Sequence, residues 1–169
     1  KLEVSCLSMD EPTEECEIHS LIGESFEDED TDTNCKIRTA VPARTFLEKM
    51  FLLAEEFQKE KPRSVRMSRH LYDLDKLMDS QYGLEALADR SLYDTIVEHR
   101  RTYYALKYVN YDLHDPATIS FLVPEAQREA WMTDYANMRR FFIYGKSPEF
   151  EVLMQRMEEL QARVRGITK

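Results

Sequence analysis

From Pro42 onward, apolar side chains recur every three or four residues along most of the chain. That spacing places them on one face of an α-helix, so it predicts a mostly helical body. We expect helices at 42–59, 64–80, 91–105, 124–143 and from 148 to near the end, with a helical turn at 84–89 and a loop at 109–124.

Two short segments before Pro42 have the pattern of strands. Residues 2–7 alternate apolar and polar side chains, and residues 36–41 form a second such segment. Because a single strand cannot form a stable sheet, we expect partner strands upstream of residue 1. The pattern is that of an α+β protein with two parts. Residues 1–41 would form a partial sheet with an acidic loop, and residues 42–169 a compact helical bundle.

The negative charge of the chain is confined to its beginning. The net charge is −9, but residues 1–35 carry twelve acidic side chains and one lysine, which gives −11 for that segment. Subtracting −11 from −9 leaves +2 for residues 36–169, so the helical part can still present a basic face to phosphate groups. We interpret the acidic stretch at 8–35 as a solvated loop.

Composition excludes several classes of protein. A hydrophobic content of 43% is typical of a folded globular chain. No apolar run approaches the roughly 20 residues that span a bilayer, and no signal peptide is visible, so we expect a cytoplasmic protein. The three cysteines form no CxxC pair and the four histidines are scattered, which argues against structural zinc.

A group of polar residues interrupts the helical pattern at 64–80. Arg66, Arg69, His70 and Asp73 are three or four residues apart and share one helix face beside the apolar stripe. A surface ion pair between Arg69 and Asp73 would explain the group simply. A site that handles phosphate or metal would explain it more fully.

The preceding helix contains a similar feature. Lys49 follows Phe46 by three residues and lies on or beside the apolar face. A lysine there either extends along its methylene stem to water or is held for a purpose. With the carboxylate and arginines of the next helix, it would form a site for the phosphates of a nucleotide and their metal ion, and Glu3 on the first strand could face the same space.

Four segments follow one another along the chain: KLEVS, TFLEKMFLL, RMSRHLYDLDKLM and DYANMRRFFIYGKSPEFEVLMQRMEEL. In this order they resemble the AbiEii/AbiGii family of nucleotidyltransferase-like toxins, found in bacterial type IV toxin–antitoxin and phage-defence systems. The resemblance covers residues 2–165. Its most specific parts are the lysine helix, the Arg-His-x-Tyr-Asp-Leu helix and the aromatic-Gly-x-x-Pro-x-Phe passage near the C-terminus.

The resemblance implies a polymerase-β-like nucleotidyltransferase fold, in which a small mixed sheet precedes a helical portion. It also implies a nucleoside triphosphate as substrate, Mg²⁺ as cofactor and, for some members, the 3′ end of tRNA as acceptor. By motif, Lys49 would contact the triphosphate and Asp73 would be the essential acid. The expected catalytic residues are therefore Asp73, Lys49 and Glu3, and the expected phosphate-binding residues are Lys49, Arg66, Arg69 and His70.

The chain lacks the metal-binding signature of such enzymes. That signature is a Gly-Ser or Gly-Gly turn followed by a strand with an Asp-x-Asp pair, which places Mg²⁺ between the triphosphate and the attacking hydroxyl. Asp28, Asp30 and Asp32 have the Asp-x-Asp spacing but not the apolar alternation of a strand. We expect no metal ligands in this chain and little activity from it alone.

Two explanations fit the absence of this metal-binding signature. The chain is either the C-terminal part of a longer toxin or a relative that has lost the metal site. The leading hypothesis is a nucleotidyltransferase that acts on RNA once joined to the missing half. The alternative is a non-catalytic helical module that binds RNA or an antitoxin partner, and the acidic segment could serve that binding.

Overall fold

A computed structural model describes residues 13–26, 28 and 34–167, in two compact units, 1–41 and 42–169. The strand expected at residues 2–7, together with Glu3, lies outside the described residues. For the described residues the α+β prediction is confirmed, because a two-stranded antiparallel sheet is followed by helices.

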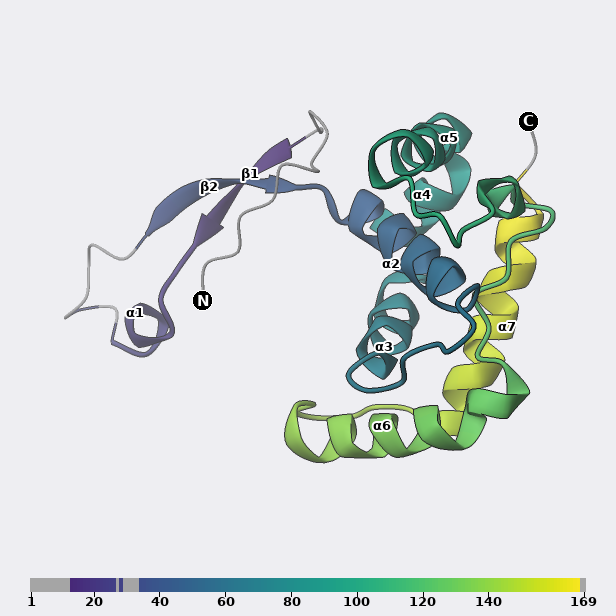
Figure 1. The fold of residues 1–169 in the computed structure, drawn as a ribbon. Coiled ribbons are helices and arrows are strands. Elements are labelled where there is room, and N and C mark those ends of the chain that lie inside the picture. The colour runs from purple at the N-terminus through teal and green to yellow at the C-terminus, as the bar shows by residue number, and fades with distance from the viewer. Residues whose placement is uncertain (1–12, 27, 29–33, 168–169) are drawn as a thin grey trace. The chain divides into compact units, whose positions relative to one another are not determined.

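The N-terminal unit contains a β-hairpin. β1 (Thr13–Ile18) pairs antiparallel with β2 (Cys35–Ala40), and the short helix α1 (Leu21–Ser25) lies between them in sequence (Figure 1). The strand expected at 36–41 is thus present, one residue earlier than predicted.

The prediction of a solvated loop throughout 8–35 was wrong for β1. The acidic side chains in β1 do not prevent strand pairing, because the register places Glu15 opposite Arg38 and Glu17 opposite Lys36. Opposite charges across an antiparallel pair stabilise it.

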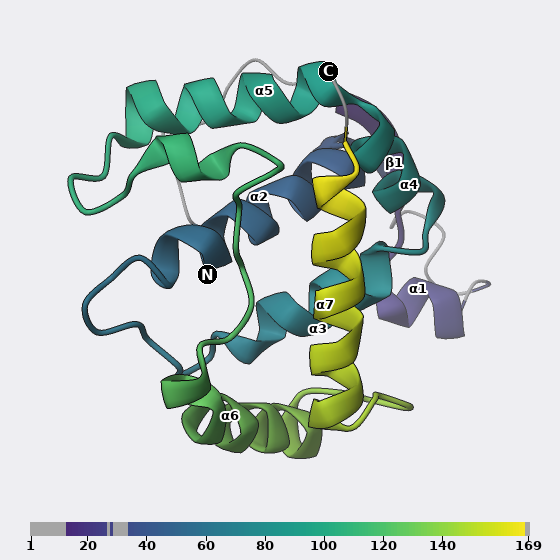
Figure 2. The same ribbon diagram turned by 90° about the vertical axis from the view of Figure 1, so that its right-hand side faces the viewer.

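The helical unit consists of six α-helices and three shorter turns within the described residues. The α-helices are α2 (Pro42–Glu56), α3 (Ser68–Leu77), α4 (Gln81–Ala88), α5 (Arg90–His99), α6 (Arg128–Phe141) and α7 (Phe150–Arg165). The shorter turns are a π-helix, η1 (Arg100–Tyr104), and two 3-10 helices, η2 (Tyr111–His114) and η3 (Glu125–Gln127). Helices α5, α2, α3 and α6 lie one after another, and α7 runs across them (Figures 1 and 2).

Helix α2 lies at the centre of the core. Its residues Phe46, Leu47, Met50, Phe51 and Leu53 are completely buried. α2 packs against α3, α4 and α5, and α3 packs in turn against α6 and α7. The apolar periodicity identified this helix because buried residues such as Phe46, Met50 and Leu53 recur at helical spacing.

The segment at 109–124, expected to be a loop with local turns, also contributes to the core. Ile119 and Phe121 are fully buried there although neither belongs to a helix or strand. Among the described residues, no helix is long and apolar enough to cross a membrane.

Candidate functional site

Lys49 on α2 and Asp73 on α3 form an ion pair across the two helices. The Lys49 Nζ lies 2.7 Å from Asp73 Oδ2, with side chains that are 24% and 37% exposed. The sequence had offered an Arg69–Asp73 pair as the simple explanation, but the ion-pair partner of Asp73 among the described residues is Lys49. The structure thus brings together the two residues that sequence reasoning had placed on separate helices.

The packing of both helices fixes where these two side chains start. Met50, next to Lys49, is completely buried, and so are Leu71 and Leu74, which flank Asp73 on α3. Because these buried neighbours fix how the two helices pack, the ammonium of Lys49 and the carboxylate of Asp73 lie at the edge of the α2–α3 contact. There they remain accessible to solvent and to a ligand.

His70 lies one turn before Asp73, and its side chain is 8% exposed. Burial, reinforced by the positive charges of Lys49 and Arg69, lowers the pKa of His70 to about 4. The imidazole is therefore neutral at pH 7. Its Nε2 accepts a 3.5 Å hydrogen bond from Arg69 Nε, so the neutral ring carries its hydrogen on Nδ1. Nδ1 is buried and has no acceptor within the described part of the chain, and His70 brings no charge to a phosphate.

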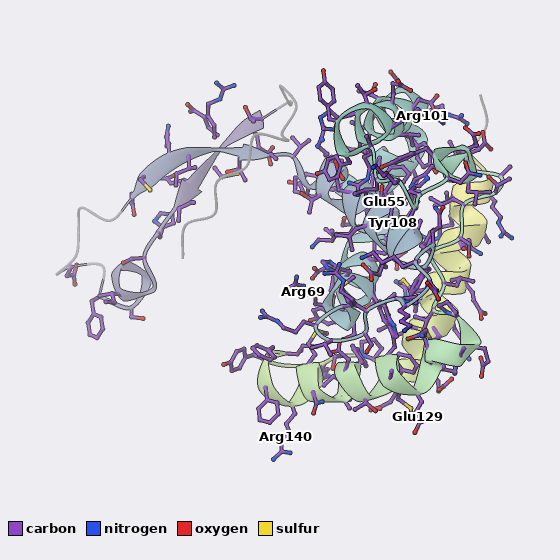
Figure 3. The ribbon with its side chains drawn as sticks, in the orientation of Figure 1. Glu55, Arg69, Arg101, Tyr108, Glu129 and Arg140 are labelled. Atoms are coloured by element: carbon purple, nitrogen blue, oxygen red, sulfur yellow. The ribbon has the colours of Figure 1, made fainter. Side chains whose placement is uncertain are left out.

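Arg66 and Arg69 differ from most arginines of the helical unit. Neither side chain has a carboxylate partner among residues 13–26, 28 and 34–167. Most other arginines of this unit form ion pairs, namely Arg44, Arg63, Arg90, Arg100, Arg101, Arg128, Arg139, Arg156 and Arg163. Figure 3 shows Arg69 on α3, extending away from the helical core. Two exposed, uncompensated guanidinium groups form a local positive site suited to phosphate.

The backbone around Arg66 is held by a residue from another helix. Asp134 on α6 accepts hydrogen bonds from the backbone N–H of Arg66 (2.6 Å), from the backbone N–H of Ser68 (3.0 Å) and from the Ser68 hydroxyl (2.5 Å). Arg66 has a φ of +61°, a left-handed conformation that is uncommon for a residue with a Cβ. Asp134 thus caps the start of α3, which begins at Ser68 and not at the expected residue 64.

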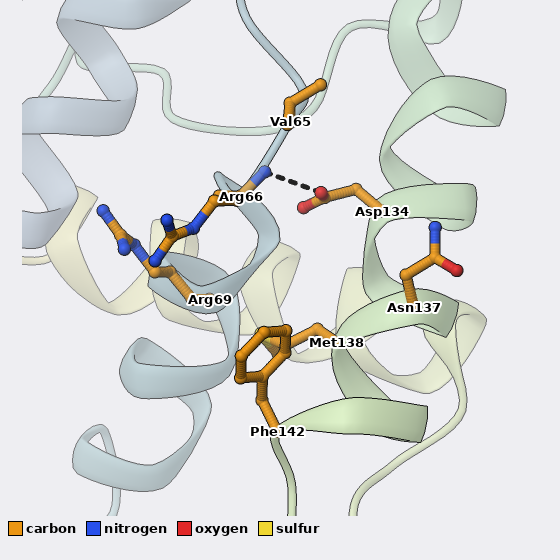
Figure 4. A pocket seen from close by; sticks show the side chains of 7 residues that line it. All are labelled: Val65, Arg66, Arg69, Asp134, Asn137, Met138 and Phe142. Carbon is orange, nitrogen blue, oxygen red and sulfur yellow. Dashed lines mark hydrogen bonds between the residues drawn. The ribbon is translucent and has the colours of Figure 1, made fainter.

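A pocket of about 420 Å³ lies between the start of α3 and α6. Figure 4 shows its lining residues, with Arg66 and Arg69 extending to the same side and Phe142 projecting from the end of α6. The pocket is lined by Val65, Arg66, Arg69, Asp134, Asn137, Met138 and Phe142. Sequence reasoning identified the two arginines. It missed the α6 residues because no local pattern indicates that a helix some 60 residues later faces them.

The described residues do not form a metal site. Among them, no three histidine, cysteine, aspartate or glutamate side chains converge. Asp28 is exposed, whereas Asp30, Asp32 and Glu3 lie outside the part of the chain that the structure describes. The Asp73 carboxylate is already paired with Lys49, so the local chemistry favours phosphate over a divalent cation.

A second charged cluster is buried. Arg100, at the start of the π-helix η1, pairs with Glu48 and Glu55 of α2, and the Glu55 carboxylate lies 3.6 Å from His114 Nε2. Burial alone would raise the pKa of Glu55, but hydrogen bonds from Arg100, together with the nearby His114, outweigh it and lower that pKa. Since Arg100 and Glu55 are almost inaccessible, we assign this cluster a structural role, tying η1 to α2.

One comparison with known proteins gave a match. The family model described as "Nucleotidyl transferase AbiEii toxin, Type IV TA system" matches residues 1–156. No curated protein and no solved structure matches the chain significantly.

Proposed function

This chain belongs to the AbiEii nucleotidyl transferase toxin family of type IV toxin–antitoxin systems, and from that premise we propose that its α2–α3 surface binds the phosphates of a nucleoside triphosphate. The nucleotide would be transferred to an RNA acceptor, of which the 3′ end of tRNA is the first to test. Lys49 and Asp73 would act at the reacting phosphates, with Arg66, Arg69 and His70 beside them.

The ion pair between Lys49 and Asp73 carries this proposal. Both groups are partly exposed, so the pair contributes only about 0–1 kcal/mol to stability. The fold therefore does not depend on it. Lys49, Arg66 and Arg69 supply three positive charges against the one negative charge of Asp73, and the surplus of two suits a polyphosphate.

In the reaction, an acceptor hydroxyl oxygen would bond to the α-phosphorus while the bond from that phosphorus to the bridging oxygen of the β-phosphate breaks. Pyrophosphate would leave, and the hydroxyl proton would pass to a nearby base. Lys49 would neutralise charge on the phosphate oxygens as it develops. Asp73 would orient the Lys49 ammonium. Its carboxylate would be the base in this cluster that accepts the hydroxyl proton.

Nucleotidyl transferases generally use a divalent metal ion, which would supply positive charge to stabilise the reacting phosphates. The described residues do not fit such an ion, because they bring no set of carboxylates together. We therefore propose that any metal ligands come from sequence beyond the described residues. The roles assigned to Lys49, Arg66 and Arg69 concern the phosphates alone.

Transfer by the native protein tests this function. Lys49→Ala and Asp73→Ala should each reduce nucleotide transfer and toxicity at least about 100-fold, which is the usual effect of removing an electrostatic catalytic group. Arg156→Ala is the matched control, since Arg156 of α7 also pairs with an α3 carboxylate, that of Asp75. It should leave transfer within about 2-fold at temperatures where the protein is folded. Unchanged transfer in both site variants would refute the assignment.

A second function is a non-catalytic module that binds RNA or a cognate antitoxin in the cytoplasm. The observation favouring it is that the described residues bring no metal-binding cluster together. Tight, Lys49-dependent binding of a nucleoside triphosphate would count against this alternative. An antitoxin bound equally by the wild-type protein and by Lys49→Ala, with no nucleotide bound by either, would support it.

A further inference from the structure

We propose that the pocket between α3 and α6 binds the terminal nucleotide of a single-stranded RNA. The identity of that RNA as the acceptor rests on the proposed function, but the binding can be measured without any transfer. The proposal adds three α6 residues and Phe142, which follows α6, to a site that otherwise consists of Lys49, Arg66 and the polar face of α3.

The pocket has an apolar wall for a base. Val65, Met138 and Phe142 contribute to its lining, and the Phe142 ring is 69% exposed although it is a large apolar side chain. An exposed aromatic ring at a pocket of about 420 Å³ offers a stacking surface to any nucleobase. The volume lies within the range of pockets that hold small ligands, roughly 300–1,000 Å³.

The pocket also carries the charge that a phosphate requires. Arg66 and Arg69 contribute two positive charges and Asp134 one negative charge, which leaves +1. The Asp134 carboxylate is already occupied by three hydrogen bonds from Arg66 and Ser68. Both guanidinium groups are without a carboxylate partner in the described part of the chain. Arg69 Nε donates a 3.5 Å hydrogen bond to His70 Nε2, and its terminal NH2 groups remain available to a ligand.

Asn137 supplies a group that can read a base edge. Its side chain is exposed at the pocket, and no hydrogen bond engages its amide among the described residues. A side-chain amide can donate and accept at once, as the edge of a base requires. A stacking ring, two phosphate-binding cations and a free amide together match one nucleotide.

The pocket adjoins the Lys49–Asp73 pair through α3. Arg69 lines the pocket, and Asp73 follows it by four residues, which is one helical turn. A nucleotide in the pocket would thus lie about one turn of helix from the phosphates proposed to bind at Lys49. An acceptor end bound there would therefore be close to the nucleotide that it receives.

The test is the affinity of the full chain for a fluorescently labelled single-stranded RNA of about ten nucleotides, measured by fluorescence anisotropy. Phe142→Ala should weaken binding at least about 5-fold, the lower limit for the loss of one stacked base. Phe141→Ala is the matched control: Phe141 is the adjacent residue, is 59% exposed and does not line the pocket. It should leave the affinity within about 2-fold.

The charge contribution needs its own pair of variants. Arg66→Ala with Arg69→Ala should weaken RNA binding and reduce its dependence on salt by about two phosphate contacts. Arg140→Ala with Arg165→Ala removes the same charge from two other arginines that lack a carboxylate partner among the described residues. This control should retain the salt dependence of the wild-type protein.

The outcomes distinguish this inference from the proposed function. If Phe142→Ala and Phe141→Ala bind RNA equally, the pocket assignment is wrong, whatever Lys49 does in transfer. If Phe142→Ala weakens binding of ATP and leaves RNA binding unchanged, the pocket belongs to the triphosphate and the inference is also wrong. If Phe142→Ala weakens RNA binding while Lys49→Ala leaves nucleotide transfer unchanged, the inference is supported and the proposed function is refuted.

Discussion

Arg66 combines an unfavourable backbone with a side chain that has no packing role. A left-handed conformation costs a residue with a Cβ roughly 1–2 kcal/mol, and Arg66 adopts it at φ +61°. A hydrogen bond to Asp134 holds the backbone there, while the guanidinium extends to the same side as that of Arg69 (Figure 4). Such strain is typical of positions that hold a ligand.

At the same residue scale, Arg66→Gly should separate stability from binding. Glycine adopts positive φ freely, so we expect the free energy of unfolding to stay the same or rise by about 0.5–1 kcal/mol, while RNA affinity falls. Arg69→Gly is the control, because Arg69 lies in the first turn of α3, where glycine relieves no backbone strain and should only destabilise. Urea denaturation measures both variants. Equal destabilisation by the two substitutions would contradict this explanation of Arg66.

Single residues also show how far sequence reasoning reaches. Lys49 and Asp73 were identifiable because each is a charged residue beside an apolar helical stripe, and the structure brings them into contact. Asp134 and Phe142 were not identifiable as site residues, since they meet Arg66 and Val65 only through the packing of α6 against α3. Long-range partners of this kind leave no local pattern.

At the scale of elements, the connection from α2 to α3 depends on one buried carboxylate. Glu56, at the end of α2, is only 2% exposed and accepts hydrogen bonds from the backbone and side chain of Arg63 and from Lys59. Burial would raise the pKa of Glu56, but these hydrogen bonds outweigh it and lower the pKa to about 2. The connection that leads to Arg66 is thereby anchored to α2.

This anchor should make stability depend on pH. The ordinary pKa of a glutamate is 4.5, and the folded value for Glu56 is about 2. Its contribution should therefore be complete above about pH 4.5 and should be lost as the pH falls toward 2. Glu56→Gln should flatten the dependence of unfolding free energy on pH in that window, whereas Glu60→Gln, at an exposed position of the same connection, should not. Parallel pH profiles for the wild-type protein and Glu56→Gln would contradict the assignment.

Elements were predicted where apolar periodicity was strong and missed where other forces decide. The helix that contains Lys49 was found because its buried residues recur at helical spacing. The strand β1 was mistaken for loop because its acidic residues lie opposite Arg38 and Lys36 in the hairpin register, which a linear pattern does not show. The π-helix η1 forms where the buried Arg100 reaches two glutamates of α2, and it too has no signal in local spacing.

At the scale of the whole molecule, net charge does not explain the proposed site. Residues 36–169 carry +2, and Lys36 and Arg38 in β2 account for it, so residues 42–169 are neutral overall. The positive character near α3 arises instead because Arg66 and Arg69 have no carboxylate partner among the described residues, while most other arginines of this unit form ion pairs. The distribution of ion pairs, and not their number, creates a surface for phosphate.

The most direct test of a functional role for the Lys49–Asp73 pair is to exchange its two members in the native protein. Lys49→Asp with Asp73→Lys retains one positive and one negative charge between α2 and α3, so the free energy of unfolding should stay within about 1 kcal/mol of the wild-type value. Nucleotide transfer should nevertheless remain as low as in Lys49→Ala, because the ammonium group no longer lies where the phosphates bind. Recovery of transfer in the exchanged protein would show that the pair serves only the fold.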